Sequence, residues 1–209
     1  MDGEPLLSIE ALRTEFPTRT GGVRAVNGLD LAIRRGEILG LVGESGCGKT
    51  VTALSILGLV DRPGRVVGGQ IKFGGIDLLS LPRGRMAQLR GEEIAMIFQQ
   101  PRGSLNPVMR IGAQIAEQFI RRRGTGRTEA WARAVALLRA VGIPAPEARA
   151  RAYPHEISGG QAQRVMIAIA LALEPQLLIA DEPTTAIDVT VQAQVLALLR
   201  ERCRASDTA

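Results

Sequence analysis

Residues 43–50 read Gly-Glu-Ser-Gly-Cys-Gly-Lys-Thr and fit the pattern G-x-x-x-x-G-K-[ST]. Glycines in such a loop let backbone N–H groups converge on phosphate oxygens. Lys49 is one of two lysines in a chain that otherwise takes its positive charge from arginine. Lysine is a compact charge on a flexible stem that fits between two phosphates, whereas arginine needs a wider site of fixed geometry. The loop therefore predicts a nucleoside triphosphate site.

A helix is expected to follow the loop at Lys49, which adds the positive end of a helix dipole to the site. The hydroxyl oxygen of Thr50 suits Mg²⁺, a cation that prefers oxygen ligands. The residues expected to surround the phosphates are therefore Gly43, Glu44, Ser45, Gly46, Cys47, Gly48, Lys49 and Thr50.

Asp181 and Glu182 directly follow an apolar run that predicts a buried strand. Ligands of open α/β sheets bind at the carboxyl ends of the strands. An aspartate at that edge can hold Mg²⁺ through water, and the neighbouring glutamate faces the position of an attacking water. Because a second carboxylate is useful as a general base, the pair favours hydrolysis over binding alone.

Ser158, Gly159 and Gly160 open a predicted helix, with Ser158 as its N-cap. Such a terminus is a second anion-binding site in one small chain. One nucleotide site has no evident use for two of them. A head-to-tail dimer, in which the phosphate loop of one chain faces this segment of the other, would use both.

The elements that must position these residues begin with short strands, predicted at residues 6–16, 23–33 and 68–75. The run Glu37–Gly43 is apolar after its first residue and ends in glycine, which is typical of a strand buried on both faces. A helix is predicted from Lys49 to about Leu59.

The rest of the chain predicts helices around two more buried strands. Apolar residues of 111–141 recur at helical spacing, and Gly142 is well placed to end that stretch. Further helices are expected from Ser158 to about Leu173 and over 189–200, with strands at 92–99 and 176–182. The predicted fold is an α/β core with a helical insertion.

Composition limits the class of protein. The chain has 209 residues, 45% of them hydrophobic and 22% charged, as expected of a globular domain. Its net charge of +5 comes from scattered arginines, which favours a solvated surface over nucleic-acid binding. Cys47 and Cys203 form neither a CxxC pair nor a metal-ligand spacing, which favours a reduced, intracellular protein. The longest uncharged apolar run is far shorter than the roughly 20 residues that span a bilayer.

Five motifs in order resemble the nucleotide-binding domain of ABC transporters: GESGCGKT, IFQQP, ISGGQ, LLIADE and AID. The resemblance runs from about Leu6 to Leu199. Within that family, YPHEISGG, SLNP and ADEPTTAIDVTVQAQV are similar to the ATPase subunits of oligopeptide, dipeptide and nickel importers. The resemblance implies a RecA-like P-loop NTPase core with an N-terminal antiparallel β subdomain and an inserted helical subdomain. One domain would span 1–209, with the core at 1–100 and 173–209 and the helical subdomain, which carries the ISGGQ signature, at 101–172.

The resemblance also implies roles in ATP binding and hydrolysis. Lys49 and the backbone of Gly46, Gly48 and Thr50 would hold the β- and γ-phosphates, and Phe16 would stack on adenine. Mg²⁺ would be served by Thr50, Gln99 and Asp181, with Gln99 also reporting the γ-phosphate to the membrane subunits. Glu182 would be the general base.

Partners and location follow from the same resemblance. The partner would be a second ATPase subunit, identical or paralogous, and its bound ATP would be contacted by Ser158, Gly159, Gly160 and Gln161 of this chain. Asp188 would belong to a loop that communicates across the dimer. Two integral-membrane permeases, served by a solute-binding protein, would hold the chain at the cytoplasmic face of the inner membrane. The transported solute, peptide or nickel, is not specified by an ATPase subunit.

The chain departs from the family pattern at several positions. Gln100, Ala162 and Ile187 replace the usual Asp, Arg and Leu, without loss of a reactive group. The family carries a histidine in the strand after the last helix, whereas this chain ends at ERCRASDTA. The only histidine, His155, is interpreted as structural. We therefore expect a chain truncated before the histidine switch, with exposed apolar faces and low solubility or weak cooperativity.

Three functions remain open from the sequence. The first is the ATP-hydrolysing subunit of a peptide-type importer. The second is a truncated copy that binds ATP, or pairs with an intact subunit, without effective hydrolysis. The third, a DNA-repair or chromosome-organising ATPase head, is disfavoured because Lys49 and Ser158 are too close for the long coiled-coil insertion of such heads, and no cysteine cluster is present.

Overall fold

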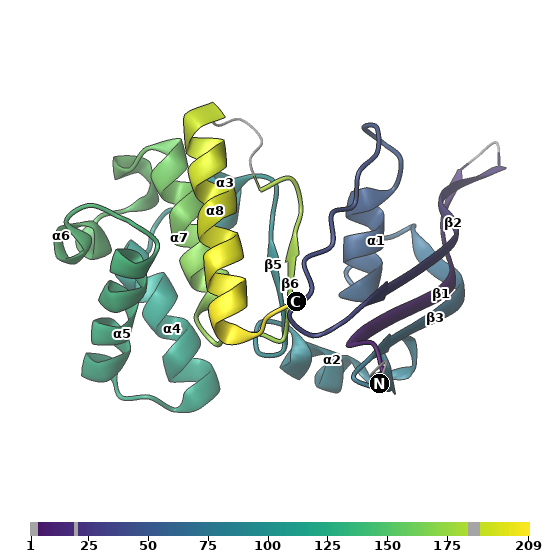
Figure 1. The fold of residues 1–209 in the computed structure, drawn as a ribbon, viewed down its shortest axis with the longest axis horizontal. Coiled ribbons are helices and arrows are strands. Elements are labelled where there is room, and N and C mark those ends of the chain that lie inside the picture. Colours follow the sequence, from purple (N-terminus) through teal and green to yellow (C-terminus); the bar gives the residue numbers. More distant parts are fainter. Residues whose placement is uncertain (1–3, 19–20, 184–188) are drawn as a thin grey trace. The chain divides into compact units, whose positions relative to one another are not determined.

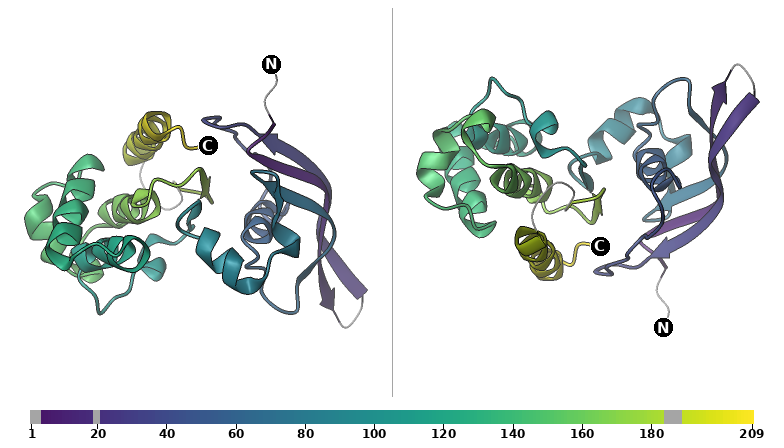
Figure 2. Two further views of the ribbon diagram at one scale, coloured as in Figure 1. Left: turned by 90° about the horizontal axis from the view of Figure 1, so that it is seen from below. Right: turned by 90° about the horizontal axis from the view of Figure 1, so that it is seen from above.

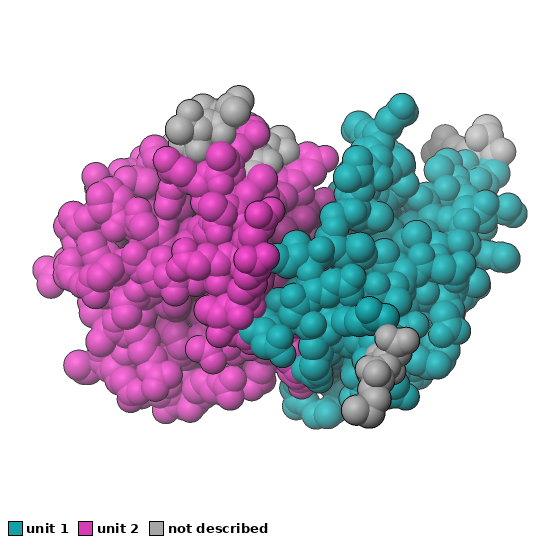
Figure 3. All heavy atoms as spheres, in the orientation of Figure 1, with its two compact units in different colours: residues 1–90, 207–209 teal, residues 91–206 magenta. Residues whose placement is uncertain are grey.

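A computed structural model of the chain describes residues 4–18, 21–183 and 189–209. The chain divides into two compact units (Figure 3), and each is described by itself. Unit 1 comprises Met1–Arg90 and Asp207–Ala209, and unit 2 comprises Gly91–Ser206. The domain division expected from the sequence, with a helical subdomain at 101–172, stays a prediction.

Unit 1 is built on an antiparallel sheet of four strands in the order β2-β1-β3-β4. The strands are β1 (Leu7–Thr18), β2 (Gly21–Ile33), β3 (Arg65–Phe73) and β4 (Ile76–Asp77). Buried residues of β1 lie at 7, 9, 12 and 14, so the alternation slips once. A β-bulge at Ala11, which has a φ of 46°, absorbs the extra residue, and the Ala11 N–H donates to Asp30 Oδ1 at 2.7 Å.

Helix α1 (Lys49–Ile56) packs against β1 and β2 (Figure 1). The buried hydroxyls of Thr14 and Ser55 share a hydrogen bond of 2.9 Å between strand and helix. Arg90 Nε donates to the carbonyl of Leu57 at 2.7 Å, at the C-terminal end of α1. The 3-10 helix η1 (Leu78–Ser80) and helix α2 (Arg83–Leu89) complete unit 1. The sheet and these contacts fix the start of α1, where the phosphate loop ends.

The strand predicted at Glu37–Gly43 is wrong: these residues form no regular element. Apolar side chains along it are exposed, Ile38 to 56% and Val42 to 94%. A strand exists only when its backbone is paired, and the described part of unit 1 gives this segment no strand partner. An apolar run thus shows that a segment requires burial without showing what will bury it.

Unit 2 combines two parallel strands with a set of helices (Figures 1 and 2). Strands β5 (Ile94–Ile97) and β6 (Leu177–Ala180) pair in register, with Ile94 opposite Leu177 and Ile97 opposite Ala180. The helices are α3 (Pro101–Ser104), α4 (Ile111–Arg123), α5 (Arg127–Ala140), α6 (Pro146–Arg151), η2 (Pro154–Glu156), α7 (Gly159–Leu171) and α8 (Val189–Ser206). None of the described helices is long and apolar enough to cross a membrane.

The core of unit 2 is aliphatic and centres on α7. Helix α7 contacts α3, α4, α5, α8 and β5. Its residues Ala162, Val165 and Ile167 are buried. Arg164 links α7 to the end of α5 and to α8, because its guanidinium donates to the carbonyl of Val141 at 2.9 Å and to Gln194 of α8 at 2.7 Å. This packing fixes the direction of the α7 N-terminus.

The helices predicted in unit 2 are confirmed with adjusted ends. The stretch 111–141 forms two helices, because Gly124 ends α4 as a C-cap with a φ of 64°. Helix α7 ends at Leu171, and α8 continues to Ser206, beyond the predicted Arg200. In α8, Val195, Leu199 and Cys203 are buried at a spacing of four, so one face of the helix extends past the predicted end.

Candidate active site

The phosphate loop of unit 1 leads directly into α1. Gly48 is the helix N-cap, with a left-handed backbone at a φ of 96°, and it offers no side chain to cover the first N–H groups of the helix. The described geometry is therefore that of a helix start whose amides face an exposed loop, as an anion site requires.

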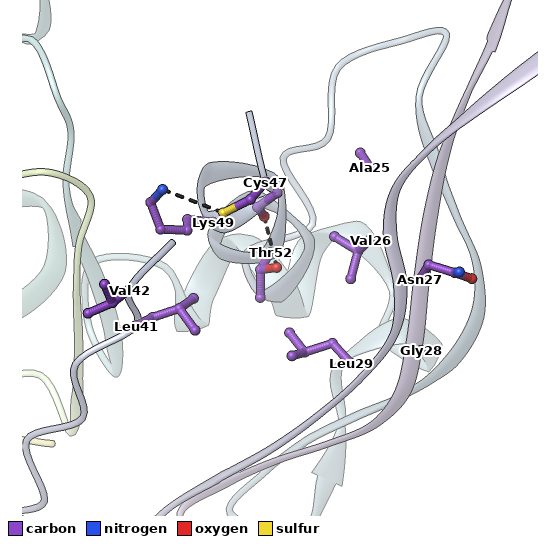
Figure 4. Close-up of a pocket in the computed structure, with 11 residues that line it drawn as sticks. Ala25, Val26, Asn27, Gly28, Leu29, Leu41, Val42, Cys47, Lys49 and Thr52 are labelled. Carbon is purple, nitrogen blue, oxygen red and sulfur yellow. Dashed lines mark hydrogen bonds between the residues drawn. The ribbon is translucent and has the colours of Figure 1, made fainter. Parts of the chain in front are cut away.

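Lys49 folds back over the loop (Figure 4). Its Nζ donates to the carbonyl oxygens of Gly43 at 2.6 Å and Glu44 at 2.8 Å, and lies 3.6 Å from Cys47 Sγ. The N–H of Cys47 donates to the Glu44 carbonyl at 3.3 Å, which closes a turn. The lysine ammonium is thus held inside the loop by neutral oxygens, which ionised phosphate oxygens can replace with stronger hydrogen bonds.

A pocket of about 300 Å³ adjoins this loop within unit 1 (Figure 4). It is lined by β2 residues from Ala25 to Leu29, by Leu41 and Val42, and by Cys47, Gly48, Lys49 and Thr52. Its walls are mostly apolar, with the lysine at one side. The hollow thus places the lysine ammonium beside apolar side chains of β2 and of the segment before the loop.

Phe16, expected to stack on adenine, is not among the residues that line this pocket. Its ring packs against Gly64 and fills the space that a side chain at residue 64 would need. The stacking role of Phe16 remains a prediction.

In unit 2, the parallel register of β5 and β6 brings distant polar residues to one edge. The Asp181 N–H donates to the carbonyl of Ile97 at 3.0 Å, so the ladder continues one residue past β6. Gln99 follows β5 and Asp181 follows β6, so both leave the sheet at its carboxyl edge. Asp181 is buried, with 8% of its surface exposed. The structure therefore places Gln99, Asp181 and Glu182 at one edge of the sheet, and their roles stay predictions.

One contact at this edge was not predicted from the sequence. Gln99 Nε2 donates to Glu182 Oε2 at 2.6 Å, across 83 positions of sequence. Glu182 has a φ of 46°, which is left-handed and strained for a residue with a side chain. The positions of Gln99 and Glu182 after two apolar runs were the available signal, but only the strand register makes them neighbours.

The residues expected to serve Mg²⁺ fit a hard cation in their chemistry. Thr50 offers a hydroxyl oxygen, Asp181 a carboxylate, and Gln99 an amide oxygen. Because Gln99 turns its Nε2 toward Glu182, its Oε1 remains as an acceptor. Thr50 belongs to unit 1, whereas Gln99 and Asp181 belong to unit 2.

The start of α7 is capped as predicted. Gln161 N–H donates to Ser158 Oγ at 3.3 Å, and Ser158 N–H donates to Gln161 Oε1 at 3.3 Å, which together make a capping box. Gly159 has no heavy atom near the position of a Cβ, so the first turn is open to an approaching group. Asp188 lies outside the described residues.

His155 lies in η2, three residues before Ser158. Its ring stacks on Tyr153 with centroids 5.7 Å apart, and the Arg110 guanidinium lies 6.0 Å from the Tyr153 ring. These ring contacts support the structural interpretation of His155.

The chain matches known proteins along nearly its whole length. A family model described as "ABC transporter" matches residues 26–185. The oligopeptide transport ATP-binding protein OppD of Salmonella typhimurium is 50% identical over 98% of this chain and 61% of that protein. The dipeptide transport ATP-binding protein DppD of Escherichia coli is 47% identical over 94% of this chain and 60% of that protein. The chain thus spans about three fifths of the length of these relatives.

Solved structures give the same result for the fold. The ATP-binding cassette MJ0796, in a dimeric post-hydrolysis state bound to ADP and Pi, superposes with a TM-score of 0.85 at 26% identity. That match covers 97% of this chain and 85% of the other. The protein cbiO1 of Clostridium perfringens, part of the complex cbiONQ, superposes with a TM-score of 0.80 at 26% identity, over 99% of this chain and 77% of that one.

Proposed function

The chain belongs to the ABC transporter family and has its P-loop NTPase fold, and from this membership we propose that it binds ATP with Mg²⁺ and hydrolyses it. The observation that carries the proposal is the phosphate loop. There the Lys49 ammonium is held by the Gly43 and Glu44 carbonyls, beside a helix start that has glycine as its N-cap.

In the proposed binding step, Lys49 exchanges its two carbonyl partners for phosphate oxygens. The exchange is favourable because hydrogen bonds to ionised acceptors are roughly twice as strong as those to neutral ones. The backbone of Gly46, Gly48 and Thr50 adds N–H donors and the positive end of α1. The apolar lining formed by Val26, Leu29 and Leu41 would receive the base and the sugar.

In the proposed hydrolytic step, Glu182 accepts a proton from the attacking water. Its carboxylate is held at the sheet edge by Gln99. A bound Mg²⁺ supplies charge neutralisation at the phosphates, and Thr50, Gln99 and Asp181 are the oxygen donors proposed to hold it. Removal of such a base lowers turnover by about 10²–10⁴-fold in typical enzymes.

We further propose that hydrolysis energises a peptide importer, as the names of OppD and DppD state for those relatives. The partners would be a second ATPase subunit, two integral-membrane permeases that hold this chain at the cytoplasmic face of the inner membrane, and a binding protein that delivers the solute. The dimeric cassettes among the similar structures support the first of these partners. In that dimer, Ser158, Gly159, Gly160 and Gln161 would meet the ATP of the partner.

The test is a paired measurement on the purified 209-residue chain. ATP binding is followed by equilibrium dialysis, and phosphate release is followed in the same preparation with and without Mg²⁺. The expected result is Mg²⁺-dependent phosphate release. ATP binding without release would favour the alternative of a non-hydrolysing ATP-binding subunit, and absence of binding would contradict both functions.

A further inference from the structure

The contact between Gln99 and Glu182 fixes which end of the amide faces which group. An ionised carboxylate only accepts hydrogen bonds, so the nitrogen of the Gln99 amide must face Glu182 Oε2, as the 2.6 Å contact has it. The planar amide then directs Oε1 to the opposite side. The nitrogen of the Gln99 side chain thereby donates to the Glu182 carboxylate, while its oxygen can accept a bond from another partner.

The hydrogen bond from Gln99 restricts the orientation of the Glu182 side chain. The side chain is only partly buried, and a glutamate loses rotamer freedom when it is fixed. Its left-handed backbone, with a φ of 46°, sets where the side chain begins. The bond from Gln99 then sets where the carboxylate ends. The parallel register of β5 and β6, which extends to the bond between Asp181 N–H and the Ile97 carbonyl, holds both ends of the pair in place.

We propose that Gln99 is a positioning residue for the Glu182 carboxylate, acting through the Nε2–Oε2 hydrogen bond. The inference rests on the proposed function, in which Glu182 is the general base. It assigns Gln99 a task that differs from serving the metal, because the metal would use Oε1 and this task uses Nε2. A small displacement of a reacting group can lower turnover by about a hundredfold.

Exchanging the side chains of Gln99 and Glu182 tests their hydrogen bond in the nucleotide-free chain, with the melting temperature as the measurement. Gln99→Glu faces one carboxylate with another, so we expect the melting temperature of the nucleotide-free chain to fall by about 2 °C or more. Glu182→Gln leaves a donor and an acceptor in contact and should stay close to the wild type. The double variant Q99E/E182Q restores one donor and one acceptor in reversed order, so its melting temperature should recover.

Turnover separates positioning from metal binding. Q99E keeps an oxygen at the same reach for Mg²⁺ and loses the N–H donor. We therefore expect kcat to fall by at least about tenfold, while KM for ATP changes by less than about twofold. Gln100→Glu is the matched control, since it makes the same change one residue away on an exposed side chain, and it should change kcat by less than about twofold.

Several results would overturn the proposal. One is a Q99E chain with unchanged kcat, which would leave Gln99 as a metal ligand alone. Another is a double variant that melts no higher than Q99E. If Q99E does not fold, the double variant must fold, and its failure would also overturn the bond. The melting cycle needs no ATP, so a wild-type chain that releases no phosphate contradicts the proposed function separately from this result.

Discussion

The carbonyl oxygen of Ala25 in β2 lies against the α-carbon of Gly48, where a side chain at residue 48 would have to stand. Gly48 is also left-handed, with a φ of 96°. The phosphate loop is therefore seated on the neighbouring strand by a backbone contact that only glycine allows. This contact fixes the start of α1 relative to the sheet of unit 1.

Gly48→Ala should therefore destabilise the chain more than Gly46→Ala. Gly46 has a similar left-handed φ of 81°, but no heavy atom lies within 4 Å of the position of its Cβ. Gly46→Ala then measures the backbone strain alone, about 1–2 kcal/mol. Gly48→Ala adds the collision, and we expect a further fall in melting temperature of at least about 2–4 °C. Equal melting temperatures for the two variants would contradict the contact.

Lys49→Ala should weaken ATP binding by about tenfold to a hundredfold, because hydrogen bonds to charged groups contribute about 1.5–3 kcal/mol each. Lys49→Arg should not restore the affinity, since a planar guanidinium does not fit among the loop carbonyls at 2.6–2.8 Å. Lys72→Ala, which removes the only other lysine from β3, is the control and should bind ATP as the wild type does. Calorimetric titration measures all three. Full affinity in Lys49→Arg would contradict the geometric reason given for lysine.

The two cysteines should differ in their reaction with a maleimide at neutral pH. Cys47 is exposed in the phosphate loop, whereas Cys203 is buried in α8, and burial raises the pKa of the Cys203 thiol. A raised pKa leaves less thiolate at a given pH, and the thiolate is the reactive form. Mass spectrometry should find Cys47 modified first, and Mg-ATP should slow that modification. Cys47→Ala is the control and should remain largely unmodified while folded. Labelling of Cys47 at an unchanged rate in saturating ATP would show that ATP binds elsewhere.

Two variants of Ser158 distinguish its role as the N-cap of α7 from its proposed contact with the ATP of a partner. Ser158→Ala removes the bond from Gln161 N–H and should lower stability by about 1 kcal/mol. Ser158→Asp keeps an acceptor for the cap but places a negative charge where the ATP of a second chain is proposed to bind. We expect Ser158→Asp to keep its melting temperature and to abolish ATP-dependent dimerisation in sedimentation velocity. A dimer that persists in Ser158→Asp would contradict the head-to-tail arrangement.

Sequence patterns predicted most of the elements and the family, both of which are confirmed. The strands β5 and β6 and the helices α4, α5 and α7 depend on local apolar periodicity and on glycine stops, which a single sequence contains. The prediction of a strand at Glu37–Gly43 is wrong because strand formation depends on a neighbouring strand, and an apolar run does not identify that neighbour. Ala11, with its bulge in β1, likewise depends on the register with β2.

The candidate site was predicted residue by residue, but not as a set of contacts. The roles of Lys49, Asp181 and Glu182 come from motif and position, and they remain proposals. The bond between Gln99 and Glu182 could not be predicted, because it depends on Ile97 standing opposite Ala180 in two strands far apart in sequence. The contact between Gly48 and the carbonyl oxygen of Ala25 could not be predicted either, since a glycine in a motif does not show which backbone atoms lie against it.

The most direct test of the account is phosphate release by the Glu182→Gln variant beside the wild type, with ATP binding measured in both. We expect the variant to bind ATP within about threefold of the wild type, because Gln is nearly isosteric with Glu and the loop around Lys49 is unchanged. Phosphate release should fall by at least about a hundredfold, because the proton acceptor is gone. Equal phosphate release from the two chains would contradict the role of Glu182 as the general base.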